Sequence, residues 1–508
     1  MFKNHPKGLL GAALSNMGER FGFYVMIAIL LLFLNNKFGF SGSQGAIIYS
    51  VFYAMIYALS LVGGRIADKT KKYKPTIMAG LVLMSLGYLL LAIPTETPVQ
   101  NMPVVLTITC LGLFSIAFGN GLFKGNLQAV VGQLYDNPKY ADKRDAGFQL
   151  FYMFINVGAF FSPLVAVIIR NWWVQAKGFL YNADLPALSH QWLSGNMTSE
   201  AEARFTELAV TQTGNAAPDL TAFAGNYLDV FVTGYHYAFG TAIVAMLISL
   251  VIFMINRRQL PDPAAKSAVR QDFGTGSQMD VREIRQRLYA LFAVFGVVLF
   301  FWFSFQQSGA VLTLFASDYT QMIKINLGFT TLEGAEVFQT FNPLFVVLLT
   351  PIVIGLFGWM KAKGIEMSTP KKIAIGMGVA ALAYTVMMLG SLGLPDAAER
   401  TAMGGLDDVA RVTPFLLIGT YLILTVAELL ISPLGISFVS KVAPPQYQGI
   451  MQGCWLTAAG LGNFFLFVGV IFYKSLPLWA TWIVFVSALS LSMIVMLAML
   501  KWLERVAK

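Results

Sequence analysis

Long apolar runs separated by short polar segments dominate the hydrophobic pattern of this chain. A helix that crosses the hydrocarbon core of a bilayer needs about 20 apolar residues, and the pattern predicts one span in each of the following ranges: 9–34, 44–66, 75–94, 103–133, 146–170, 235–255, 288–316, 337–359, 371–393, 412–440, 449–473 and 478–500. The first run is not followed by a small-residue cleavage site, so it predicts a span and not a removed signal peptide.

Two long polar segments interrupt this pattern. Residues 171–234 separate the fifth and sixth runs, and the pattern leaves open a tolerated loop, an ordered insertion or a partner site. Residues 256–287 separate the sixth and seventh runs and end in the amphipathic VREIRQRL, which predicts a flexible linker closed by a short surface helix. We therefore expect an N-terminal six-helix bundle over 1–255, a linker over 256–287 and a C-terminal six-helix bundle over 288–508.

This arrangement also predicts a fold class. Six spans, a polar central linker and six further spans are typical of the major facilitator fold, in which substrate binds between two halves near the bilayer midplane. We expect an all-α membrane protein with twelve transmembrane helices in two six-helix bundles.

Composition and charge agree with a membrane protein. The chain has 508 residues, of which 56% are hydrophobic and only 12% are charged, whereas soluble domains carry about 25% charged residues. The net charge of +9 could indicate a nucleic-acid partner, but most Lys and Arg residues fall on one side of the predicted topology. By the positive-inside rule this asymmetry predicts cytoplasmic termini in a multi-pass protein of the cell membrane, inner or plasma, with lipid and not nucleic acid around it.

The residues that usually form metal centres or catalytic pairs are sparse. Cys110 and Cys454 lie inside apolar runs, and His5, His190 and His236 are too scattered for a metal cluster. No histidine lies deep in a predicted span, and no serine or cysteine there has a base beside it. We therefore expect no enzyme activity, no metal and no cofactor.

Four charges fall deep inside predicted spans: Glu19, Arg20, Lys124 and Glu428. Each costs at least about 2.5–3.5 kcal/mol at the centre of a span, so such residues face a wet cavity or one another. A helix-packing ion pair without a transport role is the simplest alternative. Polar residues on the same spans favour a cavity lining from both halves: Tyr24, Tyr57, Asn120, Asn126, Asn156, Gln306, Gln307 and Asn342.

The signs of these charges suggest a ligand. Arg20 and Lys124 form a positive pole in the first half, and an arginine fork suits a planar carboxylate. Glu428 forms a negative pole in the second half. A zwitterion with a carboxylate at one end and an ammonium at the other would bridge the two poles, and Tyr24, Tyr57, Trp302 and Trp455 could line its side-chain pockets, although aromatic residues in spans more often serve packing.

Six segments carry a resemblance to a known family. They are GERFGFY (18–24), GGRIAD (63–68), FGNGLFKGN (118–126), FQLFYMFINVGAF (148–160), FNPLF (341–345) and AELLISPLGISFVSKVAP (427–444). Together, in this order and on these spans, they resemble the proton-coupled oligopeptide transporters, a family of the major facilitator superfamily that imports di- and tripeptides. The fifth-span and tenth-span segments are the most specific, and the resemblance covers most of the chain.

The resemblance implies roles for individual residues. Arg20 and Lys124 would hold the peptide carboxylate, whereas Glu428 and Asn342 would hold its ammonium. Tyr24, Tyr57 and Asn156 would contact the peptide backbone, with Trp302, Gln306 and Trp455 completing the expected binding residues. Glu19, paired with Arg20, would carry the coupling proton. Asp68 is expected to pin one gate, and Asp318 is a weaker candidate for the other.

Two positions depart from the family pattern. Asn16 and Gln306 stand where the family has acids, and an amide keeps hydrogen bonds but cannot exchange a proton. One hypothesis is that coupling survives through Glu19, whose protonation would release Arg20 for the substrate. The alternatives are an uncoupled or differently coupled carrier, a carrier of another substrate, and a sensor that binds peptide without moving it. We expect a monomer.

Overall fold

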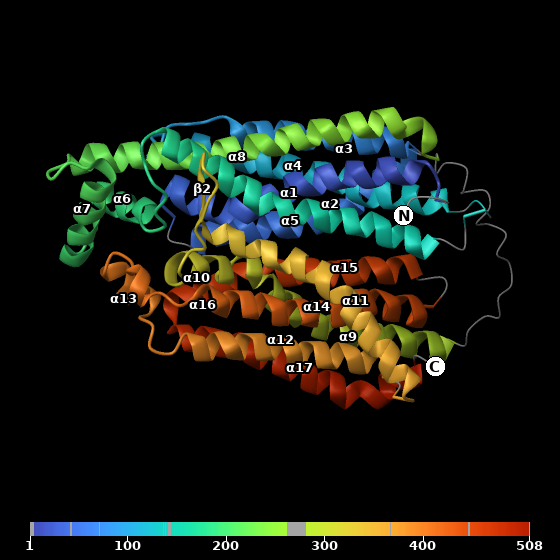
Figure 1. Ribbon diagram of the computed structural model, residues 1–508. Coiled ribbons are helices and arrows are strands. Elements are labelled where there is room, and N and C mark those ends of the chain that lie inside the picture. Colours follow the sequence, from blue (N-terminus) through green and yellow to red (C-terminus); the bar gives the residue numbers. More distant parts are fainter. Residues whose placement is uncertain are drawn as a thin grey trace.

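The computed structural model describes residues 5–40, 43–70, 72–135, 137, 139–140, 144–261, 281–365, 367–444 and 448–506. Helices run side by side along one direction, and both termini lie at the same end of the molecule (Figure 1). We call this end, where 257–261 and 281–287 also lie, the linker end, and the opposite end, which carries helices α6 and α7, the α6 end. These two names are kept throughout.

Twelve helical segments of the described chain are long and apolar enough to span a membrane. Those of the first half are α1 (Gly8–Phe38), α2 (Ser43–Thr70), α3 (Tyr73–Ala92), α4 (Met102–Leu134), α5 (Arg144–Ala176) and α8 (Leu220–Asn256). Those of the second half are α9 (Val281–Phe305) continuing through η5 (Gln306–Gly309) into α10 (Val311–Tyr319), η6 (Ala335–Thr340) with α11 (Phe341–Ala362), α12 (Thr369–Gly390), α14 (Pro414–Val442), α15 (Gln448–Phe464) with α16 (Leu466–Ser475), and α17 (Leu478–Val506). The twelve predicted spans are therefore confirmed.

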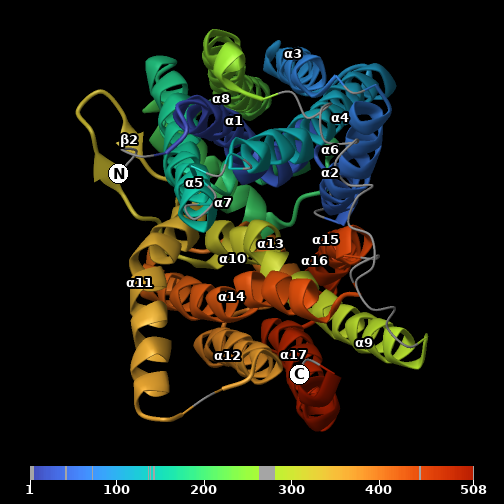
Figure 2. The same cartoon turned by 90° about the vertical axis from the view of Figure 1, so that its right-hand side faces the viewer.

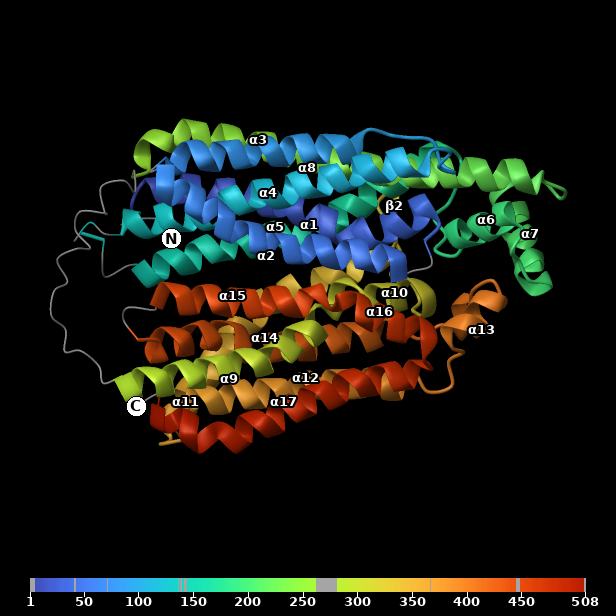
Figure 3. The ribbon, with the colours of Figure 1, turned by 180° about the vertical axis from the view of Figure 1, so that it is seen from behind.

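The helices group into two bundles. Viewed along the helices, α1 to α5 and α8 form one bundle and α9 to α12 and α14 to α17 the other (Figure 2), and the same division is seen from behind (Figure 3). In the interface, α2 packs against α15 and α16, and α5 packs against α11 and η6. The residues that face one another across this interface are thus carried by a few helices from each half.

The segment between the fifth and sixth spans is ordered and helical. Besides the ends of α5 and α8 it contains α6 (Leu185–Ser194) and α7 (Ser199–Thr213). Thr198 caps α7 by accepting a hydrogen bond from the backbone of Ala201, and the buried Phe205 lies on its inner face. Of the interpretations left open for 171–234, the ordered insertion is the one observed. The sixth span also begins earlier than predicted, because Asp219 caps α8 well outside the apolar run.

The expected short surface helix before the seventh span is wrong as a separate element. VREIRQRL forms the first two turns of α9 without a break. It contains no glycine or proline to end a helix, and Glu283 pairs with Arg287 one turn on, at 2.9 Å. A transmembrane helix can continue as a charged helix beyond the apolar span, and α9 does so at its N-terminal end.

Smaller elements complete the second half at the α6 end. Strands β1 (Ile325–Asn326) and β2 (Thr331–Leu332) form an antiparallel hairpin in which Ile325 pairs with Leu332. The hairpin turns at Gly328, whose φ of 87° favours glycine. Helix α13 (Ala397–Ala402) and the turns η2 (Arg257–Gln259) and η7 (Asp408–Ala410) make up the remaining described elements.

Candidate functional site

The ERF segment of α1 places a paired carboxylate and guanidinium in the bundle interior. Nε and Nη2 of Arg20 donate to the two carboxylate oxygens of Glu19 at 2.5 and 2.7 Å. Asn120 of α4 donates to the same carboxylate at 2.7 Å. Both charged residues are buried, so their mutual bonds offset much of the cost of taking them out of water.

Two further contacts define the surroundings of this pair. The guanidinium of Arg20 lies over the ring of Phe23, 4.9 Å from its centroid. One turn earlier, the side-chain nitrogen of Asn16 is buried and has no hydrogen-bond partner among the described residues. The position where this chain lacks the expected acid is thus a buried amide whose donor is not satisfied by the described chain.

Lys124 reaches the interface beside α2. Its ammonium lies over the ring of Tyr57, 5.5 Å from the centroid, and it interacts electrostatically with Arg20 and Glu19. α2 and α4 can approach because Gly63 meets Gly121, where a side-chain carbon would lie 2.1 Å from a backbone oxygen. This close approach sets the lysine over the tyrosine ring.

The second half supplies an acidic group on α14. Nδ2 of Asn342 donates to the carboxylate of Glu428 at 2.9 Å and to the hydroxyl of Thr425 at 3.1 Å. Glu428 is half-buried. Since this amide and carboxylate come from α11 and α14, they form a small polar group in an otherwise apolar part of the second bundle.

Tyr24 connects the two charged groups. It lies one turn beyond Arg20 and interacts electrostatically with Arg20, Glu19 and Glu428. Tyr152 of α5 also interacts with Tyr24 and Glu428 and is hydrogen bonded to Asn156, whose amide donates to the backbone oxygen of Tyr152 at 3.2 Å. Tyr24 therefore interacts with both poles, whereas Tyr152 interacts with Glu428 of the negative pole.

The remaining predicted binding residues, Trp302, Gln306 and Trp455, come from helices of the second half. The hydroxyl of Tyr53 lies 3.5 Å from the side-chain oxygen of Gln306. Trp302 is half-buried, and its indole nitrogen lacks a partner within the described chain. Trp455 is buried against Gly435 and Phe295, so its expected peptide contact stays a prediction.

Two predicted polar residues fall outside this group. Asn126 donates to the backbone oxygens of Gly63 and Leu122, at 3.2 and 2.8 Å, and so joins α4 to α2. Asp68 belongs to α2, but its side chain lies outside the described residues. Its expected gate role is therefore still a prediction.

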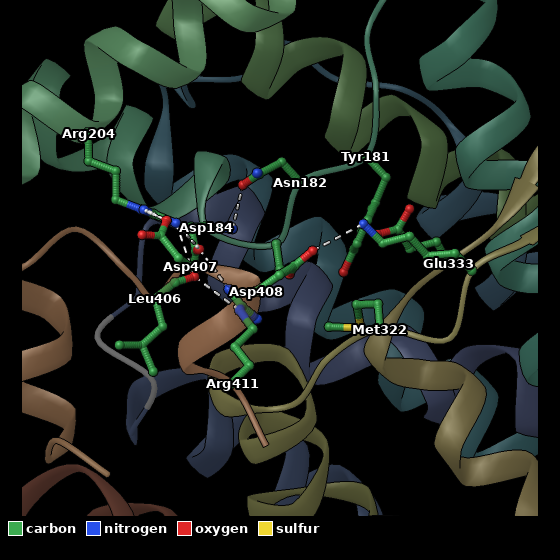
Figure 4. A pocket seen from close by; sticks show the side chains of 12 residues that line it. Tyr181, Asn182, Asp184, Arg204, Met322, Glu333, Leu406, Asp407, Asp408 and Arg411 are labelled. Carbon is green, nitrogen blue, oxygen red and sulfur yellow. Dashed lines mark hydrogen bonds and ion pairs between the residues drawn. The ribbon is translucent and has the colours of Figure 1, made fainter. Parts of the chain in front are cut away.

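A cluster of ion pairs joins the halves at the α6 end. Asp184, which precedes α6, accepts from Arg411 at 2.8 Å and from Arg400 at 3.2 Å, both in the second half. Arg204 of α7 pairs with Asp407 at 2.5 Å and lies 3.7 Å from Asp184. Figure 4 shows the side chains of Asp184, Arg204, Asp407 and Arg411 around a cavity of about 260 Å³. We call these four residues together with Arg400 the Asp184 cluster.

Asp318, the weaker gate candidate, belongs to the same region. It accepts from Arg400 at 3.0 Å and from the hydroxyl of Tyr473 at 2.9 Å, and Lys474 lies 3.9 Å away. All three partners are in its own half. Asp318 therefore reaches the first half through Arg400, which binds Asp184 with its other nitrogen.

A second cross-half pair lies nearby and is fully buried. Arg170 of α5 pairs with Glu336 of η6 and donates to the backbone oxygen of Glu333 at 3.1 Å. The rings of Tyr181 and Tyr235 lie 4.6 and 5.3 Å from this guanidinium. The next residue, Asn171, donates to the hairpin strand at Thr331. The hairpin is thus held against α5.

With this geometry in place, the sequence can be set beside known proteins. The model of the POT family matches residues 74–275 and 264–477, well over half of the chain.

The chain belongs to the POT family.

Individual relatives agree with this assignment. A peptide transporter of Yersinia enterocolitica, YePEPT, is 28% identical over 483 residues, covering 91% of this chain and 87% of the relative. Dipeptide and tripeptide permease A of Escherichia coli is 27% identical over 447 residues, covering 87% and 79%. The crystal structure of a peptide transporter POT in complex with sulfate covers 100% of this chain and 96% of its own, with a TM-score of 0.72 at 23% identity. The predicted family and the major facilitator fold are confirmed, and the chain is a multi-pass membrane protein.

Sequence reasoning missed the residues that join the halves of this POT family member. Asp184, Arg400 and Arg411 lie between predicted spans, and Arg170 and Glu336 lie at or next to the edge of one. A weak signal exists for Arg170, the last residue of a predicted span, because a charged residue within a span usually faces the bundle interior and pairs with another charge. Tyr53 and Tyr152 were also missed, although Tyr152 lies within the FQLFYMFINVGAF segment.

Two carboxylates at the α6 end have shifted pKa values. The hydrogen bond from Arg204, together with its charge, lowers the pKa of Asp407. Burial raises the pKa of Glu333, although Lys324 lies 3.1 Å from it. Among the described residues, no group of three or more His, Cys, Asp or Glu side chains is placed to hold a metal ion.

Proposed function

We propose that this chain carries di- and tripeptides across a membrane by alternating access, in symport with protons. The supporting observation is the pair of opposite poles, Arg20 with Lys124 and Glu428 with Asn342, linked through Tyr24. A peptide has one carboxylate and one ammonium, so it matches both poles at once. Membership of the POT family, and relatives named peptide permeases, support the same conclusion.

Peptide binding requires Arg20 to exchange partners. In the present geometry Glu19 occupies its guanidinium through two hydrogen bonds. Protonation of Glu19 would remove the negative charge and weaken these charge-assisted bonds, which would free Arg20 for the peptide carboxylate. Asn120 would keep the neutral carboxyl in place, because its amide oxygen is free of partners within the described chain and can accept a hydrogen bond. Proton and peptide would then occupy the site together.

The remaining expectations belong to this proposal. The termini and the linker end would face the cytoplasm, the coupling ion would be the proton, and the carrier would act as a monomer. The halves, proposed as 1–255 and 288–508, would move about the Tyr24 region while the linker 256–287 joins them.

The test is peptide uptake into proteoliposomes with and without an inward pH gradient. We expect the gradient to stimulate dipeptide uptake by the wild type, whereas Glu19→Gln retains peptide exchange and loses the stimulation, because an amide cannot release a proton. Glu283→Gln is the matched control, since Glu283 pairs only with Arg287 in the described chain, at the linker end, and it should behave as wild type.

Other outcomes would change the conclusion. Uptake that is independent of the gradient in the wild type and unchanged in Glu19→Gln would indicate an uncoupled carrier. Peptide binding without any uptake would indicate a sensor instead of a transporter.

A further inference from the structure

A fully buried tyrosine hydroxyl of α3 makes no hydrogen bond in the present arrangement. Tyr88 has none of its surface exposed, and its hydroxyl has no hydrogen-bond partner within the described chain. A tyrosine hydroxyl that is buried usually finds a partner, because taking it out of water without one costs free energy. The packing of α3 alone therefore does not explain why a tyrosine stands at this position.

The hydroxyl lies near the charged residues of α1. Tyr88 interacts electrostatically with both Glu19 and Arg20, which we call the α1 ion pair. The same pair is contacted from α4, where Asn120 donates to the carboxylate of Glu19 at 2.7 Å. Two neighbouring helices of the first bundle, α3 and α4, thus bring polar groups to one carboxylate.

Close packing of α3 against α4 fixes where these two side chains lie. An added side-chain carbon at Gly119 of α4 would lie 2.6 Å from the backbone oxygen of Gly80 and 2.6 Å from the side chain of Met84, so the two helices approach closely. Tyr88 follows Met84 by about one helical turn. Asn120 directly follows Gly119, so both polar side chains lie beside this contact. The contact therefore holds Tyr88 and Asn120 at defined positions next to α1.

The hydrogen bonds of Glu19 are complete only while Arg20 is present. Arg20 donates to both carboxylate oxygens, and Asn120 donates to one of them. When Arg20 turns to a peptide carboxylate, Glu19 loses two of these three bonds. Asn120 can then donate to one oxygen of the neutral carboxyl and accept from the other, which leaves the carboxyl one bond short of its present number. The unused hydroxyl of Tyr88 is a donor that can supply it.

We propose that Tyr88 is a positioning residue of the proton site, whose hydroxyl donates to the neutral carboxyl of Glu19 after Arg20 has turned to the peptide. This inference rests on the proposed function, in which Glu19 carries the coupling proton. The bond forms in the protonated state and is absent from the present state, so it favours protonation. It also keeps the carboxyl in place while the peptide occupies the guanidinium of Arg20.

Other ionisable groups surround the α1 ion pair and are not altered by loss of this hydroxyl. Those that interact with members of the pair directly include Tyr24 of α1, Tyr53 and Tyr57 of α2, and Lys124 of α4. On α5, Tyr152 interacts with Tyr24 and the negative pole. His236 of α8 is hydrogen bonded to the backbone of α3, and Glu336 of η6 pairs with α5. Tyr88→Phe removes one oxygen and no charge, so a change in pH dependence reports on the hydroxyl.

The test measures gradient-driven dipeptide uptake into proteoliposomes from about pH 5 to about pH 8. Tyr88→Phe should lower the pH of half-maximal uptake by about half to one unit, which corresponds to the loss of one neutral hydrogen bond. Uptake at the acid limit should match that of the wild type. The melting temperature of Tyr88→Phe at neutral pH should not fall, because the hydroxyl makes no bond in the present state. A fall would show that the hydroxyl is already bonded, and it would overturn the inference.

Two further variants decide between explanations. Tyr384→Phe is the matched control, because its hydroxyl is equally buried, lies in the second half and donates to the backbone of Ser304. Its pH of half-maximal uptake should equal that of the wild type. Asn16→Ala removes the other unused donor, about one turn before Glu19. A shift in Asn16→Ala with none in Tyr88→Phe would assign the bond to Asn16 and overturn the role of Tyr88.

The outcomes also separate this inference from the proposed function. If the gradient stimulates the wild type and the pH profile of Tyr88→Phe superimposes on that of the wild type, the role of Tyr88 is overturned and proton coupling stands. Wild-type uptake that does not depend on the gradient would overturn both.

Discussion

At the residue scale, Arg20 is occupied before any peptide arrives. Its bonds to Glu19 use the same fork that a peptide carboxylate would need, so the binding proposed for Arg20 would exchange one carboxylate for another. The negative pole differs, because Glu428 accepts a hydrogen bond from the amide of Asn342, which also donates to the hydroxyl of Thr425. In the described chain no cation pairs with Glu428, and its partner is neutral. In the proposed binding mode, the two ends of a peptide would therefore meet sites of different kinds.

This difference leads to a prediction for Glu428→Gln. A hydrogen bond to a charged group contributes about 1.5–3 kcal/mol, so the dissociation constant of a free dipeptide should rise about 10- to 100-fold. An N-acetylated dipeptide has no ammonium and should bind the variant and the wild type alike. Isothermal titration with both ligands measures the effect. Equal weakening of the two ligands would show that Glu428 does not recognise the ammonium.

At the element scale, α6 docks on the end of α1. His190 donates a hydrogen bond to the backbone oxygen of Asn36 at 2.7 Å and lies over Gly39, which ends α1 with a φ of 64°. An added side-chain carbon at Gly39 would lie 2.9 Å from the imidazole. The docking of α6 thus depends on a half-buried imidazole and a glycine that leaves room for it.

The imidazole makes this docking sensitive to pH. Burial lowers the pKa of His190 from the ordinary 6.5, so the undocked state binds more protons and docking weakens as the pH falls below about 6.5. We expect the intrinsic-rate-corrected protection of the amides in α6 and α7 to fall between pH 7.5 and pH 5.5 in the wild type. His190→Gln, which can still donate to Asn36, should show no such change. A wild type with the same intrinsic-rate-corrected protection at both pH values would contradict this prediction.

The elements also show what the sequence can and cannot predict. The spans were predictable because each needs only a long apolar run, whereas α6 and α7 have short apolar faces that become evident only when Phe205 packs near Trp192 and Phe223. Arg20, Lys124 and Glu428 were predictable because a charge in a span is conspicuous. Their partners were not, since Asn120 lies 101 residues from Glu19 and spacing along the chain does not report such a contact.

At the scale of the whole molecule, the described ion pairs between the halves all lie at the α6 end. They are the Asp184 cluster and the pair of Arg170 with Glu336. Alternating access requires the halves to separate at each end in turn. Opening the α6 end must therefore break these pairs and expose their charges to water. Hydration of the freed charges then offsets part of the free energy that the broken pairs contributed.

Two variants of this region should differ sharply. Asp184→Asn leaves Arg400 and Arg411 without their buried cross-half partner, and breaking a buried pair typically costs about 3–5 kcal/mol. Asp407→Asn removes a largely exposed carboxylate, 79% accessible, and should cost less than about 1 kcal/mol. Spin-label distances across the α6 end should lengthen in Asp184→Asn and stay unchanged in Asp407→Asn. Equal distances in both variants would show that the cluster does not hold this end closed.

One helix connects the two ends of the molecule. α8 has 37 residues without a break, which gives a rod of about 55 Å, while the hydrocarbon core is only about 30 Å thick. Its projecting part leads to α6 and α7 (Figure 1), and Arg257 and Arg258 of η2 follow its other end. A tilt of about 10° within the bilayer would move a tip about 25 Å away by about 4 Å. A displacement of this size is enough to separate hydrogen-bonded side chains. A small tilt of α8 within the bilayer therefore produces a larger movement where the halves meet.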